Sequence, residues 1–245
     1  MTQLTFVGTS DAFGAGGRRQ SAILLRSPSG GVLIDCGTTT GSGLNQLGIA
    51  IDEIDAILVS HFHGDHFGGI PLLLLAALYE EHRKRALRIA GPPGIEARVQ
   101  KLAAAMGHPL DSREWTFAIS FEELPAGRQC ELGPVKVRTF ETHHSPDAMP
   151  HGMVIETGGP RIAYSGDTGW FDALPTRVAG SDLFVCECTY HRNNFEYHLS
   201  HEELVAHRDR FDCGRVILTH LGEEMTERRG RSEFETADDG LTIRI

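Results

Sequence analysis

The stretch His61-Phe62-His63-Gly64-Asp65-His66 holds three imidazoles and one carboxylate within six residues. It directly follows the apolar run Ala56 to Ser60, which predicts a buried strand ending where the cluster begins. Imidazole suits zinc, iron and similar cations, and a carboxylate can hold a second ion close by. In an extended chain His61 and His63 point to one side, while Asp65 and His66 reach another after Gly64. The stretch therefore predicts a site for two metal ions.

The overall composition indicates an enzyme-sized chain with no general surface for binding polyanions. The sequence has 245 residues, 40% hydrophobic content and a formal net charge of -10. Its longest apolar stretch, Ile70 to Leu78, is far shorter than the roughly 20 residues that cross a bilayer. No signal-peptide pattern follows Met1. We therefore expect one domain over residues 1–245, a cytoplasmic location, no membrane span and no long nucleic acid as partner.

Apolar runs separated by turn residues predict two comparable halves. Strands are expected at 4–7, 21–26, 32–36, 56–60 and 87–90, then at 135–142, 153–156, 161–165, 183–186, 216–219 and 241–245. Helices are expected at 38–47, 67–83 and 94–106, and another begins at Ser200, where Ser200-His201-Glu202-Glu203 fits a capping box. Glu223 to Ser232 looks like an exposed polar connection. Strands with helices outside both halves predict an α/β sandwich of two sheets.

Further metal ligands are expected where strands of the second half end. His144, Asp167 and His220 each follow an apolar run that predicts a strand. A single polar residue in such a place is usually an ordinary turn residue. Three of them, in a chain that already contains the histidine cluster, favour ligands that converge on it at one edge of the sandwich.

These motifs resemble those of the metallo-β-lactamase superfamily. The matching elements are H-x-H-x-D-H at 61–66, S-G-D-T at 165–168 and T-H-L at 219–221, so the resemblance spans nearly the whole chain. Leu33-Ile34-Asp35-Cys36-Gly37 and the aspartate at position 167 are similar to the ribonuclease Z branch. The resemblance implies a four-layer αββα sandwich, the metallo-β-lactamase fold.

The resemblance also implies how the two metal ions are held. One ion would be bound by His61, His63 and His144, and the other by Asp65, His66 and His220, with Asp167 bridging them. His143 is an alternative to its neighbour His144. The ligand set favours zinc and also admits manganese or iron.

Two further residues are assigned to catalysis. His198-Leu199-Ser200 matches an H-x-S/T motif of the branch, which implies that His198 donates a proton near the phosphate; the alternative is a surface histidine before a helix cap. Glu187 is a charged residue in an apolar run and is expected to bond His198. Asp35 is expected to orient one metal histidine. Pocket walls are expected at Arg18, Arg19, Phe67, Trp170 and Tyr190.

The implied chemistry is hydrolysis by a hydroxide that the two metal ions share. Asp65 would orient this hydroxide, and His198 would protonate the leaving oxygen. A small phosphodiester, such as a cyclic or short nucleotide, is favoured because Met153 to Gly166 leaves no room for the long arm of tRNA-processing ribonuclease Z. The alternative is hydrolysis of a carboxylic ester, lactone or thioester. A tRNA 3′-processing endonuclease and a non-catalytic metal-binding protein are disfavoured, and a homodimer remains open.

Overall fold

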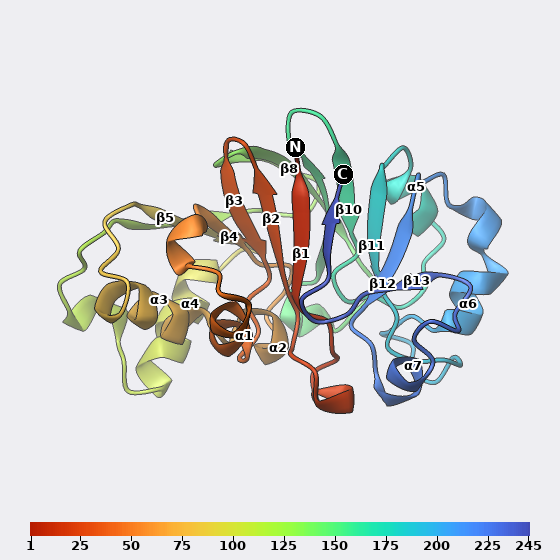
Figure 1. The fold of residues 1–245 in the computed structure, drawn as a ribbon, viewed down its shortest axis with the longest axis horizontal. Helices are drawn as coiled ribbons and strands as arrows, with labels where there is room; N and C mark the ends of the chain where they lie inside the picture. The colour runs from red at the N-terminus through yellow and green to blue at the C-terminus, as the bar shows by residue number, and fades with distance from the viewer.

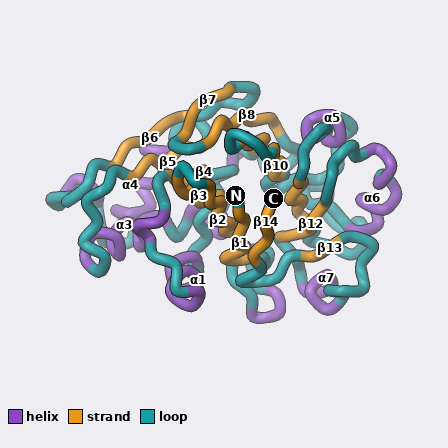
Figure 2. Tube along the Cα trace, turned by 45° about the horizontal axis from the view of Figure 1, so that its top comes forward, coloured by secondary structure: helices purple, strands orange, loops and turns teal.

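The computed structural model describes residues 1–245 as two mixed sheets of seven strands each, with helices covering their outer faces (Figures 1 and 2). The first sheet has the order β14-β1-β2-β3-β4-β5-β6 and the second the order β13-β12-β11-β10-β9-β8-β7. The predicted α/β sandwich is therefore confirmed. No helix is long and apolar enough to span a membrane.

The strands of the first sheet are β1 (Gln3–Gly8), β2 (Ala22–Ser27), β3 (Gly30–Ile34), β4 (Ala56–Leu58), β5 (Leu87–Gly91), β6 (Ile119–Glu123) and β14 (Thr242–Arg244). Those of the second are β7 (Gln129–Leu132), β8 (Val135–Glu141), β9 (His151–Glu156), β10 (Arg161–Tyr164), β11 (Leu183–Glu187), β12 (Val216–Thr219) and β13 (Glu235–Thr236). The helices are α1 (Thr40–Leu47), α2 (Gly64–Phe67), α3 (Ile70–Tyr79), α4 (Ile95–Ala105), α5 (Leu174–Val178), α6 (His201–Ala206) and α7 (Glu223–Glu227).

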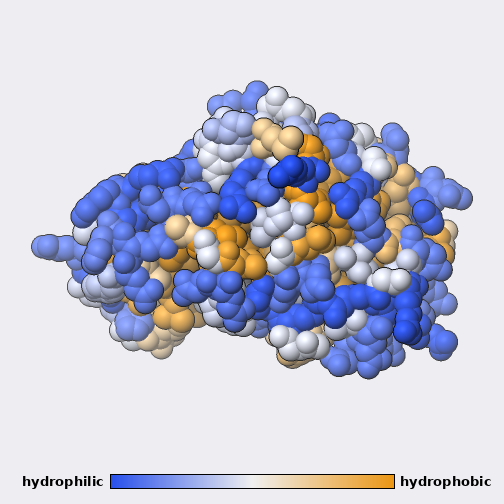
Figure 3. Space-filling model, in the orientation of Figure 1, coloured by the Kyte–Doolittle hydropathy of each residue, from blue (hydrophilic) through white to orange (hydrophobic).

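Three apolar clusters lie between the four layers. The central cluster joins inward residues of both sheets, such as Leu4 and Leu58 of the first and Ile155 and Ile217 of the second. A second cluster packs α1, α3 and α4 on the first sheet, and a third packs α5, α6 and α7 on the second. The face of the molecule in Figure 3 is mostly hydrophilic around its edge, with an apolar area at its centre. The two halves thus share one core, because each sheet buries one face against the other.

Parallel pairing gathers the loops that carry polar residues. β3 to β6 are parallel to one another in the first sheet, and β10 to β13 are parallel in the second. The carboxyl ends of parallel strands share one edge, so the loops after β4, β10, β11 and β12 meet there. Figure 1 shows α2 and α7, which follow β4 and β12, at the same lower edge of the molecule.

Some predicted elements differ from the structure. The helix expected over 67–83 is interrupted after α2 and resumes as α3, because the Gly69 N–H donates to the Cys36 carbonyl at 2.8 Å and Pro71 has no N–H to continue the helix. α3 ends at Tyr79 rather than at residue 83, and Arg83 is buried and donates to the carbonyls of Ile51 and Ile54. β6, β7, β13 and α5 were not predicted, and the polar connection from Glu223 contains α7.

Candidate metal centre and active site

Seven predicted side chains meet at the shared edge of the two sheets. Four of them, His61, His63, His144 and Asp167, place ligand atoms within 4.8 Å of one another. In this group His144 Nε2 lies 3.0 Å from His63 Nδ1, and His61 Nε2 lies 3.6 Å from Asp167 Oδ2. The neighbouring His143 is not part of the group.

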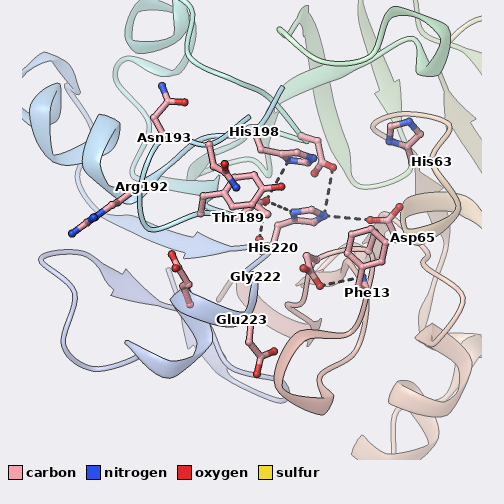
Figure 4. Close-up of a pocket in the computed structure, with 16 residues that line it drawn as sticks. Phe13, His63, Asp65, Thr189, Arg192, Asn193, His198, His220, Gly222 and Glu223 are labelled. Atoms are coloured by element: carbon pink, nitrogen blue, oxygen red, sulfur yellow. Dashed lines mark hydrogen bonds and ion pairs between the residues drawn. The ribbon is translucent and has the colours of Figure 1, made fainter. Parts of the chain in front are cut away.

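A second group shares Asp167 with the first. It consists of Asp65, His66, Asp167 and His220, again within 4.8 Å of one another. His66 Nε2 lies 3.3 Å from Asp65 Oδ2 and 3.2 Å from Asp167 Oδ1. His220 Nε2 lies 3.3 Å from Asp65 Oδ2, a contact drawn in Figure 4. Asp167 therefore belongs to both groups, and its Oδ2 lies within 3.6 Å of His61 Nε2 in the first and 3.4 Å of His220 Nε2 in the second.

The residues present fit two divalent cations. His61 Nε2, His66 Nε2 and Asp167 Oδ1 are buried and have no hydrogen-bond partner, although buried polar atoms are normally paired. Three histidines and a carboxylate on one side, and two histidines and two carboxylates on the other, are a donor set for borderline metal ions. The His/Asp cluster thus implies divalent metals.

The protonation of three of the histidines favours metal binding, whereas burial alone would lower the pKa of His66 and His220 but the adjacent carboxylates outweigh it and raise both values. Burial lowers the pKa of His61, His63 and His144, which leaves their rings neutral with a free lone pair. Burial alone would raise the pKa of Asp65 and Asp167, but adjacent histidines outweigh it and hold both pKa values well below the usual range. Both carboxylates are therefore ionised and can act as ligands.

Asp35, at the end of β3, orients the cluster from behind. Its Oδ2 lies 2.7 Å from His66 Nδ1 and accepts from Ser60 Oγ and the Tyr164 hydroxyl, both at 2.8 Å. Its Oδ1 accepts from the Ser60 backbone N–H at 2.7 Å. Asp35 has a φ of 59°, a left-handed conformation that costs a non-glycine residue free energy. These bonds fix the His66 ring with Nε2 toward the site.

His198 and Glu187 form a pair beside the second group. His198 Nδ1 lies 2.8 Å from Glu187 Oε1, and the His198 and His220 rings stack with centroids 5.4 Å apart. Burial alone would lower the pKa of His198, but the Glu187 carboxylate outweighs burial and raises it to about 9. Glu187 also accepts from the Thr168 and Thr189 backbone. The expected contact between Glu187 and His198 is present, and it keeps His198 protonated at neutral pH.

Glu187, His198 and His220 form a third set of atoms close enough to hold an ion. His198 Nδ1 and Glu187 Oε1 already bond each other, however, and His220 belongs to the second group. The hydrogen bond between acid and ring favours a proton donor over a third metal site.

A cavity of about 580 Å³ opens over these groups (Figure 4). His63, Asp65, Asp167, His198 and His220 form its floor, together with Thr189, which bonds His220 Nδ1 at 2.9 Å. The remaining lining residues come from the loop after β1, the loop after β11 and the start of α7: Asp11, Ala12, Phe13, Tyr190, Arg192, Asn193, Asn194, Gly222, Glu223 and Glu224.

Most of the expected pocket walls are wrong, with Tyr190 the exception. Arg18 is buried and bonds Thr9 and Asp238, and Arg19 bonds the Val7 carbonyl and Gln46. Phe67 packs in the core under the first sheet, and Trp170 stacks on His207. Phe13 and Arg192 also line the cavity and were not predicted, because their only signal was an apolar or charged residue in a loop after a strand.

Comparison with known proteins agrees with the fold and the site. The structure superposes on the metallo-beta-lactamase fold protein YhfI from Bacillus subtilis with a TM-score of 0.80, at 22% identity and 100% coverage of both chains. The sequence is 27% identical over 239 residues to ribonuclease Z of Mycobacterium sp. (strain KMS), covering 90% of this chain and 84% of the relative. Fold, cluster and relatives define a metal-dependent hydrolase with the metallo-β-lactamase fold, as the resemblance to the ribonuclease Z branch implied.

The family model for the Anti-Pycsar protein Apyc1 matches residues 2–237, and the chain belongs to this family. One curated member, the Anti-Pycsar protein Apyc1 of Paenibacillus harenae, is 28% identical over 233 residues, which covers 94% of this chain and 93% of the relative.

Proposed function

We propose that this protein hydrolyses a small phosphodiester, such as a cyclic or short nucleotide, at a centre of two metal ions. The proposed ligands are His61, His63 and His144 for one ion, Asp65, His66 and His220 for the other, and Asp167 between them. The proposal is supported most by the His198–Glu187 pair, because a half-buried, protonated imidazole beside a metal centre suits protonation of a leaving alkoxide.

Two bound divalent ions supply a nucleophilic water at neutral pH and neutralise charge on the phosphoryl oxygens. Asp65 lines the cavity floor, where its carboxylate would orient the attacking water. His198 holds its proton on the ring edge that faces the cavity, since Nδ1 is engaged by Glu187 at 2.8 Å. Thr189 bonds both Glu187 and His220. These bonds fix the proton donor His198, which Glu187 holds, relative to the metal ligand His220.

The segment between His144 and Asp167 supports a small substrate. β9 and β10 pair as antiparallel neighbours from Arg161–Glu156 to Tyr164–Met153, joined by a short turn. No arm that could embrace a folded RNA arises there, and the net charge of -10 disfavours a long polyanion. Ribonuclease Z activity on tRNA is therefore not the function that we propose, although relatives carry that name. Zinc is the proposed metal, because five histidines outnumber two carboxylates among the ligands.

The test compares three substrates in metal-loaded protein: bis-p-nitrophenyl phosphate, p-nitrophenyl acetate and a simple lactone. We expect phosphodiester turnover, and we expect His198→Ala to lower its kcat about 100-fold or more while the bound metal content stays unchanged. His207→Ala is the matched control, because His207 stacks on Trp170 outside the cavity. Ester or lactone turnover that does not depend on His198 would instead support an acyl hydrolase.

A further inference from the structure

Phe13 is exposed at the mouth of the cavity. Its side chain is 93% exposed, more than any other large apolar residue. In the view of Figure 4 the ring lies across from Arg192 and Asn193, and all three residues line the cavity. An aromatic side chain in solvent contributes no free energy of hydrophobic burial to folding. The stability of the fold therefore does not explain why Phe13 lies at the mouth of a polar cavity.

The loop that carries Phe13 is held in place rather than loose. Asp11 Oδ1 accepts hydrogen bonds from the backbone N–H groups of Phe13 at 3.1 Å and Ala15 at 3.2 Å. The Gly16 N–H donates to Glu223 Oε2 at 3.0 Å, which ties the loop to α7. The Asp11 N–H donates to the Leu221 carbonyl, directly after His220. The ring is therefore presented at a fixed place relative to the metal ligands.

The charged residues around the Phe13 ring limit which chemical groups of a substrate can bind against it. Asp11, Glu223 and Glu224 line the outer cavity and oppose a single cation, Arg192, in the same lining. Additional phosphates on a substrate would be repelled there. Carboxylates and the amides of Asn193 and Asn194 can instead accept hydrogen bonds from the N–H groups of a neutral heterocycle.

We propose that the outer cavity is a subsite for the heterocyclic base of a mononucleotide, and that the base stacks on Phe13. This inference rests on the proposed phosphodiesterase function and adds the part of the substrate that distinguishes a nucleotide from a phosphodiester without a base. The phosphodiester lies on the floor over Asp65 and Asp167, and the base projects toward the mouth. Stacking on an aromatic ring tolerates different bases, because each offers a π-face.

The kinetic test uses a purine and a pyrimidine 3′,5′-cyclic nucleotide together with the 3′,5′-cyclic phosphate of 1-O-methylribose, which has no base. In Phe13→Ala we expect KM for the nucleotides to rise about tenfold, so that their advantage in kcat/KM over the base-free analogue falls about tenfold. Phe13→Trp should restore it. Leu72→Ala, a change of an apolar residue 48% exposed on α3, should keep the wild-type ratio.

A binding measurement separates the two proposals. In saturation-transfer NMR we expect the base protons of the cyclic nucleotide to receive the strongest transfer in the wild type and to lose it in Phe13→Ala. An unchanged kinetic ratio in Phe13→Ala, or no transfer to the base in the wild type, would overturn the base subsite. Base contact without turnover of any phosphodiester would refute the proposed function and leave the subsite standing.

Discussion

Individual histidines in this site owe their direction to partners outside the metal groups. Asp35 holds His66, the Tyr197 carbonyl lies 2.8 Å from His144 Nδ1, and Thr189 bonds His220 Nδ1. In each case the second ring nitrogen is left facing the cluster. Partners of this kind fix the tautomer of a ligand and raise its basicity.

Replacing Asp35 should weaken metal binding. We expect Asp35→Asn to lower metal affinity about 10- to 100-fold, because His66 loses the anionic partner at 2.7 Å. Competition with a chromophoric chelator measures this change. Asp172→Asn is the control, since Asp172 pairs with Arg210 on the surface. Equal affinities in both variants would show that Asp35 does not act on the ligand.

Glu187 should set the basic limb of the pH profile. A proton donor must be protonated, so kcat falls as the pH rises through the pKa of His198, which Glu187 raises to about 9 against the effect of burial. Bound cations lower this value, and Glu187→Gln should lower it further and shift the limb to lower pH. Rate profiles of Glu187→Gln and of the exposed control Glu202→Gln test this, and coinciding profiles would contradict it.

The sequence predicted the chemistry of single residues better than their surroundings. His61 to His66, His144, Asp167 and His220 could be recognised because ligand types stood directly after apolar runs. Arg18 and Arg19 were misplaced because a loop residue can turn to either side, and burial against Asp238 and Asp239 is a contact across the chain. Phe13 gave only a weak local signal, since its loop is tied through the Gly16 N–H to Glu223, a contact across the chain.

Helices and strands with a strong local sequence pattern were predicted. Strands that form mainly because a neighbouring strand offers free backbone groups were not. The capping box at Ser200 is present as expected, and the strands expected at 21–26 and 32–36 are β2 and β3, which pair as antiparallel neighbours. β6, with the sequence ISFEE, and β7, with QCEL, are partly exposed edge strands with few apolar residues. They form because β5 and β8 offer unpaired backbone groups, which a single-segment pattern does not contain.

The cap of α6 stabilises the loop that carries His198. Ser200 accepts from the Glu203 N–H, and Glu203 accepts from the Ser200 N–H. We expect Ser200→Ala to lower the free energy of unfolding by about 1 kcal/mol. Urea denaturation measures it, with Ser120→Ala on exposed β6 as the control. A loss no larger than that of the control would mean that the cap adds nothing.

The whole molecule brings the metal groups together only when both sheets are assembled, because His61 to His66 follow β4 while Asp167 and His220 follow strands of the second sheet. Metal should therefore stabilise the fold. At metal concentrations far above Kd we expect the Tm to rise about 10 °C over chelated protein. In differential scanning fluorimetry, we expect metal to raise the Tm of His198→Ala by a similar amount. We expect most of this rise in Tm to be absent in Asp167→Asn. Identical shifts in both variants would contradict the ligand assignment.

The most direct test of a centre of two metal ions is a titration of metal-free protein with zinc. At each zinc concentration the phosphodiester turnover and the metal content of the sample are measured. The two groups that share Asp167 predict that turnover of bis-p-nitrophenyl phosphate reaches its plateau at two bound ions per chain. A plateau at one ion per chain, or full turnover in the metal-free protein, would contradict it.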